Sequence, residues 1–346
     1  MGNGYSFFVC QLCCFSCCVN LEACVYSLLP ALGAFVQTDD NVDAALLEVE
    51  SMSVTLRAVT DDSDGFAVEL CEIAASHGVR YMFEASVGGG IPIIRPMMTD
   101  LASNKINSIN GILNGTTNYI LTAMRDDGKS FADALGEAQR LGYAEANPAA
   151  DVEGKDAARK TVILGAIASG KLVSPEAIST EGITNISLCD VELAQMLGYS
   201  IKLIGHAEDR DGKLLAFVSP MAVSESNPLA RIDGVFNGIL VNANMVGDVM
   251  FYGPGAGKLP TASAVVADIV DVIAKRDVPP TPVGWVKAEA SDIAPLEDYV
   301  CPRLVIVDGE CDNALATLDG KSAYFTSPIS EAEARKINAA AIYRVL

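Results

Sequence analysis

The chain has 346 residues, of which 50% are hydrophobic and 20% charged, and its mean hydropathy is +0.30. This composition is typical of a globular protein with two or three domains, and it argues against disorder for most of the chain. The formal net charge of −20 argues against nucleic acid or an anionic membrane as a partner and favours a small-molecule enzyme. Only His77 and His206 are present as histidines, so we expect neither a histidine-based triad nor a histidine-rich metal site.

The first fifty residues are atypical because they hold six of the ten cysteines. These six are Cys10, Cys13, Cys14, Cys17, Cys18 and Cys24. No second pair follows at zinc-finger spacing, so a metal site is not favoured. The apolar run Phe7–Val19 is too short to span a membrane, and it lacks the basic residues that begin a signal peptide. We expect residues 1–50 not to be a natural domain; lipid anchoring through Gly2 and the cysteines, or a degenerate nucleotide fold, are the alternatives.

A dinucleotide-binding domain begins with a strand that leads into Gly-x-Gly-x-x-Gly. Residues 1–64 contain only three glycines, and none stands in that context. The sequence therefore predicts that residues 51–83 are the remnant of such a domain. Its expected elements are a strand at Ser53–Ala58, a helix at Gly65–Ser76 that ends in a C-cap at His77-Gly78, and a strand at Val79–Phe83.

The segment Glu84-Ala-Ser-Val-Gly-Gly-Gly-Ile-Pro-Ile-Ile94 carries three consecutive glycines. They indicate backbone with positive φ or a close approach to another part of the chain. Such a loop can present carbonyl oxygens to a hard cation or amides to an anion, and the Glu84 carboxylate favours the cation. A plain turn between a strand and a helix explains the glycines equally well.

The run Ile106–Leu113 predicts a strand, and Asn114-Gly115-Thr116-Thr117 after it predicts a tight turn into a helix capped by threonine. The polar start of that helix could bind an anionic group of a substrate, although capping alone also explains these residues.

From Asp151 onward the pattern is helical and places Asp156 and Lys160 four residues apart on one face. The same face continues into apolar residues, so we expect Lys160 to be partly buried and suited to proton transfer. Glu145, just past Gly142-Tyr143, supplies another carboxylate. A solvated helix pair is the simpler alternative for Asp156 and Lys160.

These segments together resemble homoserine dehydrogenase, and the likeness extends in unbroken order over about residues 66–275. Met250-Phe-Tyr-Gly-Pro-Gly-Ala-Gly257 resembles the glycine-rich turn that contacts the nicotinamide cofactor in that family. The resemblance implies that Lys160 is the acid or base of the reaction. It implies a substrate site at Glu145, Asp156, Asn114, Gly115 and Thr116, a cofactor turn at Gly253, Gly255 and Gly257, and a sodium site at Glu84, Val87, Gly89 and Ile91.

The sequence departs from the family in a second lysine. Relatives carry it in a Thr-Ala-Asn-Lys turn, and a gapless comparison puts Thr60 in its place. No lysine precedes Lys105 in this chain.

The remaining pattern is α/β. Helices are expected at Ser130–Leu141, Asp190–Leu197 and Lys258–Lys275, and strands at Ser200–His206, Leu214–Val218, Val235–Asn242 and Arg303–Val307. Three prolines, Pro279, Pro280 and Pro282, predict a linker.

We therefore predict an α/β protein with a partial Rossmann-like nucleotide half, a substrate and dimerisation domain with a mixed sheet at 84–278, and a small α/β appendage at 279–346. The implied activity is the interconversion of L-homoserine and L-aspartate 4-semialdehyde with NADP or NAD. It would serve threonine, methionine and isoleucine biosynthesis in a cytoplasmic homodimer or larger homo-oligomer. Because the Gly-x-Gly-x-x-Gly turn is absent, we expect weak cofactor binding and slow turnover or none. A non-catalytic subunit of the same family is the alternative, and a lipid-anchored protein at a membrane surface is a third.

Overall fold

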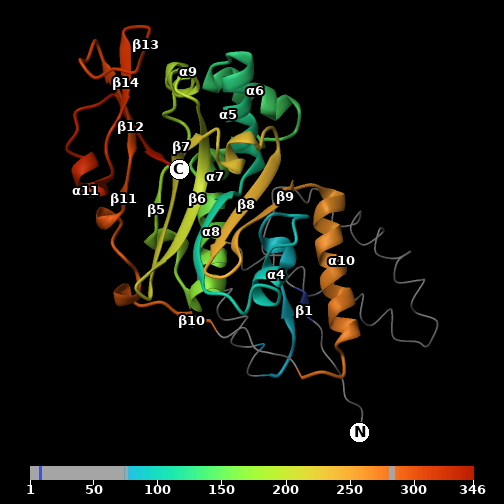
Figure 1. The fold of residues 1–346 in the computed structure, drawn as a ribbon. Helices are drawn as coiled ribbons and strands as arrows, with labels where there is room; N and C mark the ends of the chain where they lie inside the picture. The colour runs from blue at the N-terminus through green and yellow to red at the C-terminus, as the bar shows by residue number, and fades with distance from the viewer. Residues whose placement is uncertain (1–7, 10–73, 75–76, 280–284) are drawn as a thin grey trace.

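The computed structural model describes residues 8–9, 74, 77–279 and 285–346 of the chain (Figure 1). Apart from Phe8–Val9 and Ala74, the atypical N-terminus and the strand and helix expected before residue 77 lie outside the described residues. The predicted C-cap is confirmed, because Gly78 has a φ of +61° and Val79 donates its N–H to the Ala74 carbonyl at 2.9 Å.

One large mixed sheet organises the described part of the chain, in the order β13-β14-β12-β16-β7-β6-β3-β8-β9, with β5 pairing separately with β7. Its strands are β3 (Ile106–Ile112), β5 (Ser179–Thr180), β6 (Tyr199–Arg210), β7 (Lys213–Ser224), β8 (Phe236–Ala243), β9 (Gly247–Pro254), β12 (Arg303–Asp308), β13 (Ala316–Leu318), β14 (Lys321–Phe325) and β16 (Ala341–Val345). Short pairs outside this sheet join β1 (Phe8–Val9) to β2 (Tyr81–Met82), β4 (Lys171–Leu172) to β10 (Val286–Lys287), and β11 (Val300–Cys301) to β15 (Ile329–Ser330).

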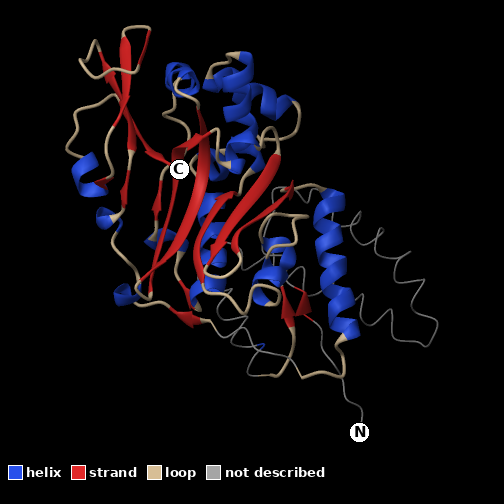
Figure 2. Ribbon diagram, viewed as in Figure 1, coloured by secondary structure: helices blue, strands red, loops and turns tan. Residues whose placement is uncertain are grey.

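Helices gather on one face of this sheet (Figure 2). The α-helices are α4 (Ile94–Met98), α5 (Gly115–Asp127), α6 (Phe131–Arg140), α7 (Ala149–Val152), α8 (Lys155–Ser169), α9 (Leu188–Met196), α10 (Lys258–Ala274) and α11 (Glu331–Ala334). Short 3-10 helices are η1 (Glu84–Ser86), η2 (Pro175–Ala177), η3 (Pro228–Arg231), η4 (Ala290–Asp292) and η5 (Leu296–Asp298). None of the helices in the described ranges has the length and apolarity that a membrane crossing requires.

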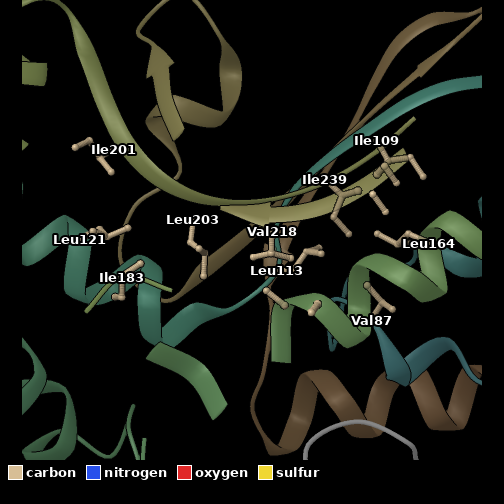
Figure 3. Close-up of a cluster of buried hydrophobic side chains, with 14 of the residues drawn as sticks. Val87, Ile109, Leu113, Leu121, Leu164, Ile183, Ile201, Leu203, Val218 and Ile239 are labelled. Atoms are coloured by element: carbon tan, nitrogen blue, oxygen red, sulfur yellow. The ribbon is translucent and has the colours of Figure 1, made fainter. Parts of the chain in front are cut away.

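The main core lies between the sheet and α5, α8 and α9. Figure 3 shows Leu203 and Val218 on the sheet facing the helices that carry Leu121 and Leu164. All four side chains are at most 3% exposed. Alternation along β6 and β7 puts one set of apolar residues on this face, and the hydrophobic effect then holds the helices against it.

A two-residue turn fixes the register between β6 and β7. Asp211 and Gly212 have φ values of +53° and +82°, and Arg210 pairs with Lys213 across the turn. Two positive φ values in a two-residue loop are typical of the hairpin turn that matches strand twist. This long hairpin is the centre of the sheet to which the other strands add.

Within the described residues, the helices expected at Ser130–Leu141, Asp190–Leu197 and Lys258–Lys275 are confirmed with ends shifted by at most two residues, and the expected strands are present as β2, β3, β6, β7, β8 and β12. The sequence did not predict α4, β14 and β16, and it missed β9 because the end of that strand had been interpreted only as a glycine-rich turn. The predicted strand at Arg303–Val307 is β12, and it joins the main sheet. The last strand, β16, pairs in parallel with β7, with Arg344 opposite Met221. The sheet is therefore continuous across the boundary expected near residue 279, and the division into domains stays a prediction.

Candidate active site

The end of β3 places Asn114 at the start of α5. Its side-chain Oδ1 accepts the Thr117 backbone N–H at 2.9 Å and the Thr117 hydroxyl at 3.0 Å. The prediction of a threonine cap was wrong, because Asn114 itself caps the helix. An extended residue with a short polar side chain can reach the amide three residues later, and Asn114 has φ −130° and ψ +117°. Thr116 donates its hydroxyl to the Tyr143 carbonyl at 2.6 Å.

The other end of the Asn114 amide joins two carboxylates. Nδ2 donates to Oδ1 of Asp151 at 2.7 Å and to Oδ2 of Asp156 at 2.9 Å. One side chain thus caps α5 with its oxygen and holds two acids with its nitrogen. The geometry fixes the orientation of the Asn114 amide.

Lys160 completes the cluster. Its Nζ donates to Oδ2 of Asp156 at 2.7 Å and to the Leu113 carbonyl at 3.1 Å. The residue is 4% exposed, so the predicted burial and the predicted pairing along one helix face are both confirmed. The simpler alternative of a solvated pair does not hold, because the lysine lies inside the protein.

Asp151 was not predicted as a site residue. Burial raises the pKa of its carboxyl, and the neighbouring charge of Asp156 acts in the same direction, while the hydrogen bond from Asn114 and the charge of Lys160 oppose them. Asp151 comes close to Asp156 because the chain bends between α7 and α8 at Gly154, which has a φ of +81°. A glycine between two aspartates was the available signal in the sequence.

Glu145 lies outside this cluster. It is exposed, and its backbone carbonyl accepts the side-chain amide of Gln139 at 3.0 Å. The side-chain hydrogen bonds that join Asn114, Asp151, Asp156 and Lys160 do not include Glu145. Gly115 packs closely against Val235, since a Cβ on Gly115 would lie 2.7 Å from the Val235 carbonyl oxygen. This position has no room for a side chain.

The two predicted glycine loops lie against each other. Gly88 and Gly89 have φ values of +73° and +57°, and a Cβ on Gly89 would lie 2.4 Å from the Gly255 carbonyl oxygen. Gly90 donates its N–H to the Pro254 carbonyl at 3.2 Å. The prediction that these glycines mark positive φ and close approach is confirmed.

Gly255 is enclosed on its other side by Asn237. A Cβ on Gly255 would lie 2.1 Å from Cγ of Asn237, whose side chain is fully buried under the turn. Gly257, with a φ of +121°, precedes α10, and no side chain caps that helix. Gly255 therefore shapes the turn by packing, whereas Gly257 presents the open N-terminus of α10.

The Glu84 carboxylate has a role that the sequence did not indicate. Its Oε1 accepts the N–H groups of Ile93 and Ile94 at 2.7 and 2.8 Å, and its Oε2 accepts that of Arg95 at 2.8 Å. Glu84 thus caps α4 from a position 3% exposed. Its own N–H donates to Asp268 on α10 at 2.9 Å.

The remaining predicted sodium ligands can offer only carbonyl oxygens. The side chains of Val87 and Ile91 are at most 1% exposed and belong to the core, where Figure 3 labels Val87. No donor in the described residues bonds the carbonyls of Val87, Gly89 or Ile91. The same part of the chain contains no group of three histidine, cysteine or acidic side chains that could hold a metal ion. A cation here would be held mainly by backbone.

In this α/β fold a buried lysine, two aspartates and an amide side chain lie together at the end of one strand of a mixed sheet. This arrangement is suited to binding a small polar substrate and moving its proton. A sequence profile of homoserine dehydrogenase matches residues 92–270. The chain belongs to the homoserine dehydrogenase family.

Individual relatives agree with this assignment. Homoserine dehydrogenase of Synechocystis sp. is 48% identical over 212 residues, which cover 60% of this chain and 49% of the relative. That of Neisseria gonorrhoeae is 49% identical over 204 residues, which cover 59% of this chain and 47% of the relative. The chain spans about half the length of these curated relatives.

Solved structures show the same likeness. A homoserine dehydrogenase from Thiobacillus denitrificans has a TM-score of 0.73 at 35% identity, covering 81% of this chain and 73% of that one. A hyperthermophilic archaeal homoserine dehydrogenase mutant in complex with NADPH has a TM-score of 0.53 at 31% identity, covering 61% of this chain and 60% of that one.

Proposed function

We propose that this protein interconverts L-homoserine and L-aspartate 4-semialdehyde with NAD(P). The observation that carries the proposal is the cluster of Asn114, Asp151, Asp156 and Lys160, with hydrogen bonds of 2.7 to 2.9 Å between its side chains. The names of the relatives favour this enzyme over a non-catalytic subunit.

Lys160 is the proposed proton carrier. Its Nζ lies 2.7 Å from Asp156, and as an ammonium group it can donate a proton to the aldehyde oxygen of the semialdehyde. In the reverse direction a neutral Lys160 would take the proton of the homoserine hydroxyl. Burial beside Leu113 keeps water from competing for that proton.

The carboxylates orient the substrate in this proposal. Asp156 holds Lys160 and can accept the substrate hydroxyl, while Asp151 lies beside it with Oδ1 fixed by Asn114. A carboxylate in this position can pair with the substrate ammonium group. Glu145 remains a proposed second partner of that ammonium from the exposed side of the site.

The cofactor is proposed to bind along the glycine-rich turn. Gly253 and Gly255 form its packed part, and Gly257 leads to the open N-terminus of α10, where backbone amides favour an anionic group. Bound NAD(P) would accept or return the hydride. The proposed cofactor is NADP or NAD. The same proposal includes a sodium ion at Glu84, Val87, Gly89 and Ile91. It also includes a cytoplasmic homodimer that serves threonine, methionine and isoleucine synthesis.

The test is calorimetric titration of the full chain with L-homoserine, with and without NADPH, beside an assay of homoserine oxidation. L-2-aminobutyrate, which lacks the hydroxyl, is the matched control ligand and is expected to bind more weakly. The proposed substrate would be contradicted if the chain bound both amino acids equally well, or if it bound neither. Sedimentation equilibrium tests the homodimer.

A further inference from the structure

We infer that Arg344, on the last strand of the sheet, is a positioning residue for Asp151 and Asp156 and acts on them through Glu181. The inference rests on the proposed substrate site. Three contacts support it, and together they connect β16 to the bend between α7 and α8.

The first contact joins β16 to the segment after β5. Both terminal nitrogens of Arg344 lie 3.3 Å from Oε1 of Glu181, and the arginine side chain is 6% exposed. The guanidinium also lies 4.9 Å from the centre of the Phe217 ring and 3.0 Å from Oε2 of Glu331. These partners hold the guanidinium in one place.

The second contact joins the segment 181–183 to the end of α7. Ile183 donates its N–H to the Val152 carbonyl at 2.8 Å. Between them, a Cβ on Gly182 would lie 2.1 Å from the same carbonyl oxygen. On the other side, Glu181 donates its N–H to the Val218 carbonyl on β7 at 2.8 Å. The segment is therefore fitted closely between β7 and Val152.

The third contact concerns the bend that brings the two aspartates together. A Cβ on Gly154 would lie 3.1 Å from Cγ2 of Thr180 and 3.3 Å from the Glu181 carbonyl oxygen. Gly154 donates its N–H to the Asp151 carbonyl at 2.9 Å. A displacement of Glu181 is thus expected to reach the bend and change the separation of Asp151 from Asp156, because packed backbone transmits small shifts.

Glu181 is the gentler place to break this chain of contacts. Its side chain is 51% exposed, whereas Glu331, the other acidic partner of Arg344, is 10% exposed and also pairs with Arg303 at 3.1 Å. Glu181→Gln therefore leaves the buried ion pairs intact. Arg344→Met removes the cation and tests the same link from β16.

The matched control is another arginine and glutamate pair of the C-terminal region. Arg335 and Glu297 lie 3.6 Å apart, and both side chains are more than half exposed. Arg335 also approaches Glu331 at 3.5 Å, so Arg335→Met alters the charge around Glu331 without touching Glu181. Glu297→Gln controls for the loss of a surface carboxylate.

The experiment measures amide hydrogen exchange and the affinity for L-homoserine in the full chain, with thermal unfolding as the check on folding. In Glu181→Gln and Arg344→Met, the amides of Gly154 and Ile183 should exchange faster, and the dissociation constant for L-homoserine should rise about threefold to tenfold. The double variant should be no worse than the worse single variant, because both changes break one link. The controls should leave both quantities unchanged.

Unchanged exchange at Gly154 and Ile183 in both variants would overturn the inference. So would faster exchange with unaltered L-homoserine affinity, because a purely structural role lowers stability without changing the affinity of the folded protein. If Arg344→Met does not fold, Glu181→Gln decides. If the unaltered chain binds no L-homoserine, the proposed function fails, and the exchange data alone decide whether Arg344 positions the bend.

Discussion

The Nζ atom of Lys160 lies 2.7 Å from Oδ2 of Asp156, one helical turn earlier on α8. The lysine is buried at 4% exposure, whereas the aspartate side chain is 21% exposed. Lys160 therefore lies on the core side of the pair, and Asp156 lies nearer to solvent.

Lys160→Met should lower the rate of homoserine oxidation by about 10² to 10⁴, because it removes the group that carries the proton. Affinity for L-homoserine should change much less. Lys155→Met is the matched control, since Lys155 lies on the same helix but is 61% exposed and pairs with Glu153. Steady-state kinetics and calorimetry measure both quantities. A full rate in Lys160→Met would refute its assignment.

Asn114→Ala should cost both stability and substrate affinity. The variant loses a helix cap and also leaves Asp151 and Asp156 without their shared donor. Ser130→Ala removes the cap of α6 and an exposed hydrogen bond to the Asp133 carboxylate, and should cost about 1 kcal/mol. Asn114→Ala should cost about 1 to 3 kcal/mol more, the range for buried polar groups left unpaired. Urea denaturation and L-homoserine titration compare the two, and equal losses of stability would contradict the bridging role.

Asp151→Asn should separate stability from function. The pKa of Asp151 is raised in the folded protein, chiefly by burial, so between its unfolded and folded pKa values the folded state binds more protons and stability falls as pH rises. The asparagine removes this loss. The melting temperature of Asp151→Asn minus that of the unaltered chain should therefore be higher at pH 7 than at pH 3. The affinity for L-homoserine should fall.

Asp209→Asn provides the opposite sign. The Lys105 hydrogen bond lowers the pKa of Asp209, so this carboxylate contributes stability above its unfolded pKa, and that contribution is lost as pH falls through the folded value. Between pH 3 and pH 7, the melting temperature relative to the unaltered chain should therefore rise for Asp151→Asn and fall for Asp209→Asn. The same direction in both would show that the Asp151 environment is wrongly described.

Gly89→Ala should destabilise the protein more than Gly128→Ala does. Both glycines have similar φ values, +57° and +63°, but a Cβ on Gly89 meets Gly255 whereas Gly128 has open space. Left-handed backbone alone costs about 1 kcal/mol at Gly128. Overpacking adds about 1 to 3 kcal/mol at Gly89. Chemical denaturation measures the difference, and its absence would mean that the two loops do not touch.

The sequence predicted those features that depend on local pattern. Lys160 and Asp156 were paired because four residues make one helical turn, and the strand at Ile106–Leu113 followed from its apolar run. The helix α5 was expected, but its cap was placed at a threonine, whereas the helix is capped by Asn114 and begins at Gly115, because asparagine and threonine both suit a cap position.

Features that depend on distant contacts were missed. Asp151 enters the site only because the chain bends at Gly154 against the segment after β5. Glu84 was expected to face a cation, yet its carboxylate accepts three backbone N–H groups of α4, a use that sequence spacing does not reveal. The parallel pairing of β16 with β7 joins residues more than a hundred positions apart.

The contact between Gly89 and Gly255 has a thermodynamic consequence. Neither Gly89 nor Gly255 has room for even one added carbon. A ligand that shifts the glycine-rich turn at Gly255 must therefore also shift the loop that contains Gly89. Binding at one loop then carries a free-energy cost or gain at the other, and linkage requires the effect to be equal in both directions. An ion held by the carbonyls of Val87, Gly89 and Ile91 would change the affinity for a nucleotide by the same factor by which the nucleotide changes the affinity for the ion.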